Sequence, residues 1–380
     1  MTMTHRERLI TALDHREPDR VPIDLGGSRS TGMVLPAYDR LREHLGFGEP
    51  GAIHDRMLQV VVMDEQVMEY LDVDVRGFAY GERDVPLAAN LGDDRYRDDW
   101  GIVRWKPSSS PYFDLEVSPL AGEVSVADVA RYDWPDPTDP GLFRGLREQA
   151  RRLHEETDYG VMFNARFSIV QHAQYLRGFM DFYLDLGANH AMFHAVMTAI
   201  TDVMVEINRR ALAEVGEFVD VVSWADDVGS QDRTMCSPAD YRAHIKPYHA
   251  RAMATIREYA PQARTYYHSC GSVYEFVEEF IDLGITALNP IQVTATNMEP
   301  ERLKGDFGDR IAFWGALDSQ RILPFGSADD VRGEVRRLFE ILGEDGGWVL
   351  AAVHNIQPDV PPENVLALVD EGRRCRYGDA

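Results

Sequence analysis

The tetrapeptide His268-Ser269-Cys270-Gly271 has the residue types and spacing best suited to metal chemistry in this sequence. Residues two apart in an extended segment project to the same side, so the imidazole of His268 and the thiolate of Cys270 could bind one ion. Gly271 would then let the backbone turn sharply away. A thiolate beside an imidazole suits zinc. A buried cysteine beside a capping histidine would give the same pattern, so the tetrapeptide alone leaves metal binding open.

His354, in the segment VLAAVHNIQPDVPPEN, is the candidate third ligand. It follows the apolar run 347–353, which has the character of a buried strand. An isolated histidine at a strand end is usually structural. His354, however, is expected at the same end of the fold as the His-x-Cys pair, and this position favours its role as a metal ligand. Three protein ligands would leave a fourth position open, as in catalytic rather than structural zinc sites.

Other polar side chains follow apolar runs and are candidates for proton transfer or substrate contact. Asp226 and Asp227 could orient a metal-bound histidine, hold a substrate proton or ligate the metal directly. A solvated loop that caps a helix is an equal alternative for each aspartate taken alone. The predicted substrate-binding residues are Asn164, Arg166, Asn289 and Asp318. Cys236 precedes Ser237-Pro238, a helix start, and we interpret it as a packing residue.

Alternating strands and helices must position these residues. Six apolar runs predict parallel strands at 160–165, 219–225, 264–269, 285–290, 311–316 and 347–353, and two earlier runs at 20–25 and 72–78 make eight. The helical patterns are at 4–15, 36–46, 57–71, 169–214, 238–259, 272–282, 328–343 and 361–374. Eight strands favour an α/β fold of the (β/α)8 TIM-barrel type, in which the C-terminal strand ends meet at one face. An open doubly wound sheet is the alternative.

The N-terminal part of the chain has a different pattern of predicted elements. Residues 95–123 predict a small antiparallel hairpin insertion, and the turn-rich connector 134–141 follows it. We therefore expect a single barrel domain over residues 1–380, with an N-terminal extension and elaborations in 1–141.

Charge and composition exclude several functions. The net charge is −24, with 39 basic and 63 acidic side chains, which disfavours binding to nucleic acid. No run approaches the roughly 20 apolar residues that span a membrane. The N-terminus has no apolar signal segment and the chain has only three cysteines, so we expect a cytoplasmic protein without a disulfide framework. The sequence does not predict the oligomeric state.

Four segments of the chain together resemble the uroporphyrinogen decarboxylase-like family. They are RERLITALDHREPDRVPIDLGG, HSCG, FWGALDSQRILPFGS and NIQPDVPPENV, and the resemblance covers nearly the whole chain. It implies a (β/α)8 barrel. It also implies one of two branches: tetrapyrrole decarboxylases, which need no metal, or zinc methyltransferases that work with corrinoid proteins.

The sequence departs from both branch patterns. The decarboxylases carry an Arg-Gln-Ala-Gly-Arg element whose arginines hold substrate carboxylates, whereas this chain has only Arg29 there, in Asp-Leu-Gly-Gly-Ser-Arg-Ser. The methyltransferases have a His-x-Cys pair, matched by His268 and Cys270, and a distal cysteine, whose position falls on His354. A His/Cys/His set is less electron-rich than one with two thiolates. It points away from a thiol substrate such as coenzyme M and towards a methyl ether or related O- or N-methyl compound.

The resemblance and the residues together predict a zinc-dependent methyltransferase. It would move a methyl group between a small methylated substrate and a corrinoid protein, with zinc on His268, Cys270 and His354. Asp226 or Asp227 would handle a proton or orient a ligand. The alternative is a metal-free uroporphyrinogen decarboxylase-type lyase that acts on a tetrapyrrole or a smaller acid. A non-catalytic protein that binds metal or tetrapyrrole is the third possibility.

Overall fold

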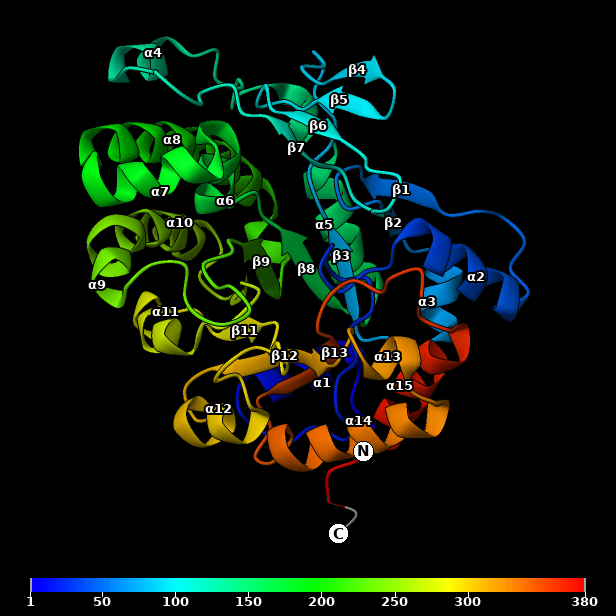
Figure 1. The fold of residues 1–380 in the computed structure, drawn as a ribbon. Coiled ribbons are helices and arrows are strands. Elements are labelled where there is room, and N and C mark those ends of the chain that lie inside the picture. Colours follow the sequence, from blue (N-terminus) through cyan, green and yellow to red (C-terminus); the bar gives the residue numbers. More distant parts are fainter. Residues whose placement is uncertain (1, 379–380) are drawn as a thin grey trace.

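A curled parallel sheet forms the centre of this computed structural model, which describes residues 2–378. Its seven strands lie side by side in chain order and are all parallel (Figure 1). They are β3 (Val75–Phe78), β8 (Gly160–Asn164), β9 (Val221–Ala225), β10 (Arg264–His268), β11 (Ala287–Asn289), β12 (Ala312–Leu317) and β13 (Trp348–Ala352). The predicted α/β fold of TIM-barrel type is confirmed.

The segment 21–24 closes the sheet between β13 and β3 in place of the eighth strand expected at 20–25. Ile23 makes an isolated parallel bridge with Leu350 of β13. Its carbonyl also accepts a hydrogen bond from the backbone N–H of Asp74, just before β3, at 2.8 Å. The segment forms no longer strand because Pro22 has no N–H to donate and the chain turns at Gly26, whose φ is +101°.

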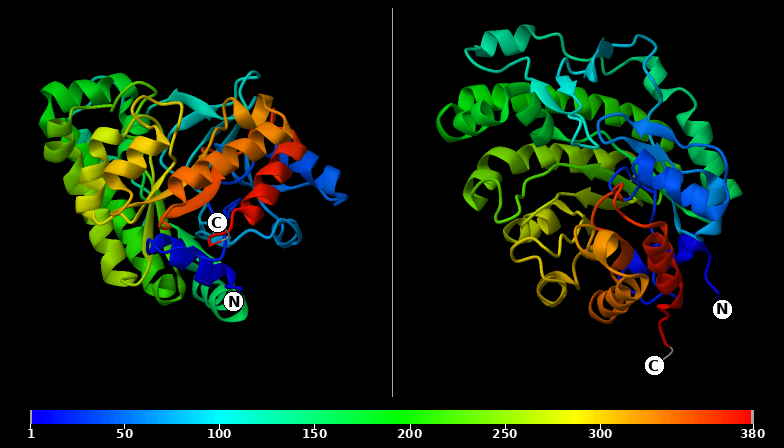
Figure 2. Two further views of the ribbon diagram at one scale, coloured as in Figure 1. Left: turned by 90° about the horizontal axis from the view of Figure 1, so that it is seen from below. Right: turned by 45° about the vertical axis from the view of Figure 1, so that its right-hand side comes forward.

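Helices cover the outer face of the sheet, as Figure 2 shows from two further directions. They include α5 (Leu146–Glu156), α6 (Ile169–Arg177), α7 (Phe179–Ala188), α8 (His190–Val215), α10 (Lys246–Tyr259), α11 (Val277–Leu283), α12 (Pro300–Phe307), α14 (Ala328–Leu342) and α15 (Pro362–Arg374). The remaining helices are α2 (Leu35–Leu45), α3 (Glu65–Tyr70), α4 (Val126–Arg131), α9 (Pro238–Asp240) and α13 (Ile322–Phe325). No helix among residues 2–378 combines the length and the apolar character that a bilayer crossing needs.

Helix α1 (His5–Leu13) covers the N-terminal end of the barrel and lies behind the strands in Figure 1. Thr4 and Glu7 form a capping box that fixes the start of this helix. Leu9 and Leu13 pack into one apolar cluster with inward-facing strand residues such as Trp314. This end of the barrel is therefore filled, which leaves the C-terminal strand ends for the functional site.

Two predicted helices differ from the structure. The helix expected at 169–214 is three helices, because Gly178 adopts a φ of +82° after α6 and Asn189 caps the start of α8. The helix expected at 57–71 is replaced by β2 (Val60–Val62) followed by the short α3. Three consecutive valines favour a strand because their β-branched side chains fit poorly in a helix.

The antiparallel insertion expected near residues 95–123 is confirmed and is larger than a hairpin. Its four strands are β4 (Ala89–Gly92), β5 (Arg95–Arg97), β6 (Val103–Trp105) and β7 (Asp114–Val117). A separate hairpin pairs β1 (Ala52–Asp55) with β2. Tyr112, between β6 and β7, donates a hydrogen bond to Asn355, which follows β13. The insertion therefore reaches the C-terminal ends of the barrel strands.

Candidate metal centre

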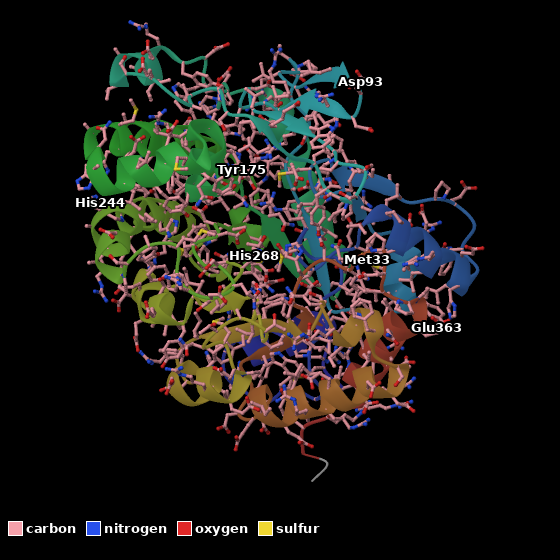
Figure 3. The ribbon with its side chains drawn as sticks, viewed as in Figure 1. Met33, Asp93, Tyr175, His244, His268 and Glu363 are labelled. Atoms are coloured by element: carbon pink, nitrogen blue, oxygen red, sulfur yellow. The ribbon has the colours of Figure 1, made fainter. Side chains whose placement is uncertain are left out.

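The three predicted metal ligands converge at the C-terminal ends of the barrel strands. His268 is the last residue of β10, and Figure 3 shows it within the ring of strands. Gly271 turns the chain after Cys270 with a φ of +89°, and a Cβ there would lie 2.5 Å from the carbonyl oxygen of Ser230. His354 follows β13 by two residues. Parallel strands bring these distant parts of the sequence to one face.

The ligand atoms of His268, Cys270 and His354 all lie within 4.8 Å of one another. The closest pair is His268 Nε2 and Cys270 Sγ, at 3.4 Å. The rings of the two histidines face each other edge-on, with centroids 5.6 Å apart. Ligands at about 2.0–2.3 Å around a tetrahedral zinc lie roughly 3–4 Å from one another, so small side-chain rotations would complete the set. Two imidazoles and a thiol are donors that zinc accepts.

Side-chain amides hold both histidines in the tautomer that a metal needs. Nδ1 of His268 donates to Oδ1 of Asn289 at 2.6 Å, and the other end of that amide donates to the Trp314 carbonyl at 3.0 Å. Nδ1 of His354 donates to Oδ1 of Asn355 at 2.8 Å. With Nδ1 carrying the proton, each ring keeps an unprotonated Nε2, and that of His268 lies beside Cys270 Sγ. Such partners orient metal-bound histidines in known sites.

The electrostatics of the site also favour a cation. Burial lowers the pKa of His268 to about 4, and burial lowers the pKa of His354 as well, so both imidazoles are neutral at pH 7. Burial, followed by the nearby charge of Asp227, raises the pKa of the Cys270 thiol well above its usual value. A bound divalent cation would reverse this effect and stabilise the thiolate.

Asp227 lies beside the three ligands. Its Oδ1 accepts a hydrogen bond from the backbone N–H of Cys270 at 2.8 Å and lies 3.9 Å from Nε2 of His268. Its Oδ2 lies 3.4 Å from the side-chain nitrogen of Gln171. The carboxylate is partly exposed, with 27% of the side chain accessible. A catalytic role for Asp227 stays a prediction.

Asp226 has a different set of partners and is almost fully buried. Its two oxygens accept hydrogen bonds from the backbone N–H groups of Val170 and Gln171, both at 2.8 Å, in the first turn of α6. Nε2 of the buried His249 lies 3.1 Å from Oδ2. These contacts tie β9 to α6 and α10, and a catalytic role for Asp226 stays a prediction.

The predicted substrate-binding residues differ in how many hydrogen bonds their side chains already make within the protein. Asn164 accepts from the Ser223 hydroxyl at 2.7 Å and donates to the Gly27 carbonyl at 3.0 Å. Asp318 is buried and accepts from two backbone N–H groups in its own loop. Arg166, after β8, remains exposed. Asn289 is committed to His268 and Trp314, and direct contact of these four residues with substrate remains a prediction.

Sequence reasoning missed the residues that support His354. Asn355 accepts from Tyr112 at 2.7 Å and from the side chain of Gln357 at 2.6 Å, in addition to its bond with His354. Asn355 directly follows the predicted ligand His354, and this position in the sequence could have indicated its supporting role. Tyr112 lies in the insertion, and no pattern in the sequence indicated that the insertion contacts the barrel.

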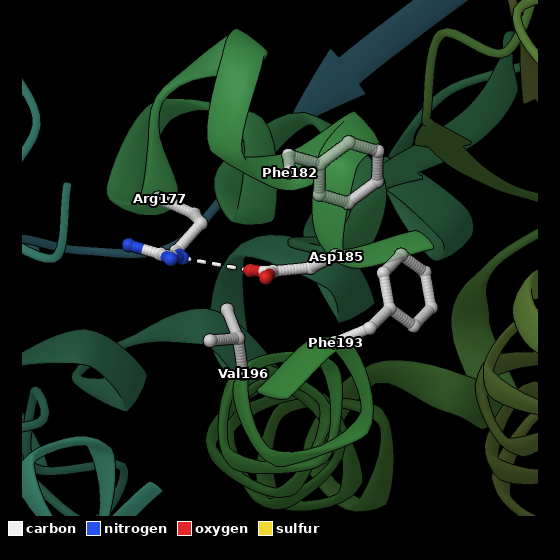
Figure 4. Close-up of a pocket in the computed structure, with 5 residues that line it drawn as sticks. All are labelled: Arg177, Phe182, Asp185, Phe193 and Val196. Carbon is white, nitrogen blue, oxygen red and sulfur yellow. Dashed lines mark hydrogen bonds and ion pairs between the residues drawn. The ribbon is translucent and has the colours of Figure 1, made fainter. Parts of the chain in front are cut away.

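Two cavities lie away from this centre, near the far end of α6. One is an open apolar surface formed by Phe179, Met180, Tyr183 and Leu184. The other, shown in Figure 4, is lined by Arg177, Phe182, Asp185, Phe193 and Val196. Nε of Arg177 bonds to Asp185 at 2.8 Å in its wall. The first is an exposed surface of α7 and the second lies between α6, α7 and α8; neither contains a predicted site residue.

Known proteins resemble the chain in sequence and in fold. Uroporphyrinogen decarboxylases from Syntrophotalea carbinolica and Alkalilimnicola ehrlichii are 24% and 23% identical to it, covering 95% and 97% of this chain and 95% and 94% of theirs. The solved structure of a methyltransferase from Methanosarcina mazei is 19% identical, with a TM-score of 0.67, and covers 98% of this chain and 99% of that one. This likeness shows a shared fold. Residues 106–375 match the uroporphyrinogen decarboxylase (URO-D) family, and the chain belongs to that family.

Proposed function

We propose that this protein is a zinc-dependent methyltransferase that moves a methyl group between a small methylated substrate and a corrinoid protein. The convergence of the His268, Cys270 and His354 donor atoms within 4.8 Å, at the open end of the barrel, is the observation that carries the proposal. Two neutral imidazoles and a thiol gathered at one place match the donor types that zinc binds. Three ligands would leave a position for substrate, as in catalytic zinc sites.

Zinc held by these ligands would act as a Lewis acid on the heteroatom that carries the methyl group and make it a better leaving group. The residues of this chain have separate tasks. His268 and His354 are held by Asn289 and Asn355 with Nε2 free. The rigid support means that little reorganisation is needed when a ligand binds.

Asp227 would donate a proton to the substrate heteroatom or accept one from it. Its carboxylate lies within 3.9 Å of His268 Nε2 and is partly open to the mouth. A substrate heteroatom placed at the ligand cluster would lie close to this carboxylate, which could supply or remove a proton as the methyl group leaves or returns. The backbone N–H of Cys270 fixes Oδ1 at 2.8 Å and keeps the carboxylate in place.

The alternative is a lyase that removes carboxyl groups from a tetrapyrrole or a smaller acid without metal. The names of the two curated relatives favour it, because both are uroporphyrinogen decarboxylases. The chain lacks the arginine-rich N-terminal element of that branch and has only Arg29 in its place. We therefore rank this function second.

An assay of cobalt methylation tests the proposal. The zinc-loaded protein is mixed with cob(I)alamin, or with a reduced corrinoid protein, and with methoxylated aromatic compounds and methylamines in turn. We expect an absorbance change for cobalt methylation with at least one methyl compound, and its loss after zinc is removed by a chelator. Product release from the methyl compound in the absence of any corrinoid would contradict the proposal.

A further inference from the structure

Arg166 has no acidic partner among residues 2–378, although acidic side chains far outnumber basic ones in this chain. The two arginines whose charges act on Arg166 are themselves paired: Arg29 with Asp55 at 3.4 Å, and Arg83 with Asp99 at 3.1 Å. The Arg166 side chain is nevertheless exposed. An unpaired cation that stays accessible in an acidic protein is available for an external anion.

The surrounding residues hold Arg166 in a defined position. Its backbone N–H donates to Oδ1 of Asn208 at 3.0 Å, and Nδ2 of Asn208 donates to the Arg166 carbonyl at 3.1 Å. The guanidinium lies over the ring of Tyr80, 4.6 Å from its centroid. The hydroxyl of Tyr80 also donates to Asn208. One face of the guanidinium is thus covered by an aromatic ring, which leaves its edge of N–H groups for a ligand.

Charges of both signs lie near Arg166, and the nearest acidic one, Asp99, is paired with Arg83. Desolvation lowers the pKa of the Arg166 guanidinium; Tyr80 and Asp99 act in the opposite direction, and Arg83 and Arg29 lower the pKa. The group stays charged at neutral pH because an arginine pKa lies above about 12. An anion bound to this charged guanidinium, which has no ion-pair partner of its own among residues 2–378, would gain a favourable charge interaction.

Arg166 and the metal cluster share one end of the barrel. Arg166 follows β8 by two residues, as His354 follows β13, and the strands are parallel. Gln171, five residues after Arg166, approaches Asp227 beside the metal cluster, with its side-chain nitrogen 3.4 Å from Oδ2 of Asp227. A small substrate at the metal cluster could therefore reach Arg166 with its other end.

We propose that Arg166 forms an anion subsite and that the methylated substrate carries a carboxylate that binds there. This inference rests on the proposed function, which places the methyl group of the same substrate at the metal cluster. A planar carboxylate matches the edge of a guanidinium with two parallel hydrogen bonds. Neutral methyl ethers and cationic methylamines lack this contact, so the subsite selects among the substrates of the methyl transfer.

Binding measured without turnover tests the subsite. Isothermal titration calorimetry of the zinc-loaded protein compares methoxyacetate, 3-methoxybenzoate and 4-methoxybenzoate with the corresponding amides. We expect at least one carboxylate to bind on the order of 10-fold or more tightly than its amide, as for a charge-assisted pair. Arg166→Gln should bring the ratio close to one, and Arg166→Lys should keep part of it, because lysine retains the charge but not the planar fork.

Arg147→Gln is the matched control, because Arg147 also lies over an aromatic ring, Phe218, at 5.1 Å. Phe218 precedes β9, so this pair lies at the opposite end of the barrel. The control should keep the preference for carboxylate. Equal binding of acid and amide to the unsubstituted protein, or an unchanged ratio in Arg166→Gln, would overturn the subsite. If the carboxylate preference depends on Arg166 but cobalt is never methylated, the subsite stands and the methyltransferase function falls.

Discussion

Oδ1 of Asn289 accepts a hydrogen bond from Nδ1 of His268 at 2.6 Å, across the neighbouring strands β11 and β10. The bond fixes both the tautomer and the orientation of the imidazole, because the amide is itself held by the Trp314 carbonyl. The lone pair of Nε2 is then directed towards Cys270, 3.4 Å away. Metal binding at this site should therefore depend on a residue that is not a ligand.

Replacing Asn289 with Leu should weaken zinc binding while leaving three ligands in place. Loss of a supporting hydrogen bond to a histidine ligand typically costs about 10–100-fold in metal affinity. Competition with a chromophoric chelator measures the change. Asn90→Leu, on the exposed strand β4, is the control and should bind zinc normally. Unchanged zinc affinity in Asn289→Leu would show that His268 needs no such support.

Asp227→Asn should retain zinc and the fold but lose methyl transfer. The carboxylate lies beside the ligands and is partly open to the mouth, so loss of its acid–base function should reduce turnover by about 10²–10⁴-fold. Initial rates of cobalt methylation measure this loss. Wild-type turnover by this variant would remove Asp227 from the mechanism.

Asp226→Asn should act on stability instead. Its buried carboxylate accepts two backbone hydrogen bonds from α6 and contacts His249. Loss of charge-assisted bonds in the interior should lower the free energy of unfolding by roughly 1.5–3 kcal/mol. Urea denaturation gives this value. A variant with unchanged stability and strongly reduced turnover would instead place Asp226 in the catalytic machinery.

Much of the barrel could be predicted from the sequence, because buried parallel strands are continuous apolar runs followed by polar residues. The runs at 160–165, 219–225, 264–269 and 285–290 contain strands that end at Asn164, Ala225, His268 and Asn289. The segment at 20–25 was harder to interpret, because Ile23 bonds to both neighbouring strands yet Pro22 and Gly26 limit the pairing to one residue. The breaks at Gly178 and Asn189 depend on backbone conformations that hydrophobic periodicity does not encode.

The convergence of the three candidate ligands was also predictable, because His-x-Cys and a histidine after the last strand carry their chemistry in their residue types. Their supports were not. Asn289 was expected at substrate, and its bond to His268 follows from the register of β10 with β11. Tyr112 contacts Asn355 only because the insertion folds back onto the barrel, a tertiary contact with no local signature.

Ionisation of Asp24 should lower the free energy of unfolding as the pH rises from about 4 to 6. Burial raises the pKa of this carboxyl from 3.8 to about 6, despite hydrogen bonds from Gly27 and Trp314. The folded protein therefore retains a proton that the unfolded chain has lost, and the stability conferred by the protonated form disappears above pH 6. One pKa unit corresponds to about 1.4 kcal/mol, so the loss should be roughly 3 kcal/mol.

Urea denaturation of the wild type and Asp24→Asn at several pH values isolates this group. Asn cannot ionise, so the stability difference between the two proteins should shift in favour of Asn as the pH rises through the window. Parallel pH profiles for the two proteins would contradict the raised pKa of Asp24.

Purified protein should not convert uroporphyrinogen to coproporphyrinogen. The chain has only Arg29 where the decarboxylase branch carries its arginine-rich element. Chromatography of the porphyrins after oxidation measures both compounds, with an authentic uroporphyrinogen decarboxylase as the positive control. Robust coproporphyrinogen formation would favour the lyase over the methyltransferase.

Zinc X-ray absorption spectroscopy, together with metal content, tests the central claim most directly. The account predicts one zinc per chain with one sulfur at about 2.3 Å and histidine nitrogens at about 2.0–2.1 Å. Cys270→Ala should lose the sulfur contribution and most of the metal while keeping its fold by circular dichroism. Cys236→Ala, at a free cysteine outside the ligand cluster, should match the wild type. A wild-type protein that binds no zinc, or whose zinc has no sulfur ligand, would contradict the account.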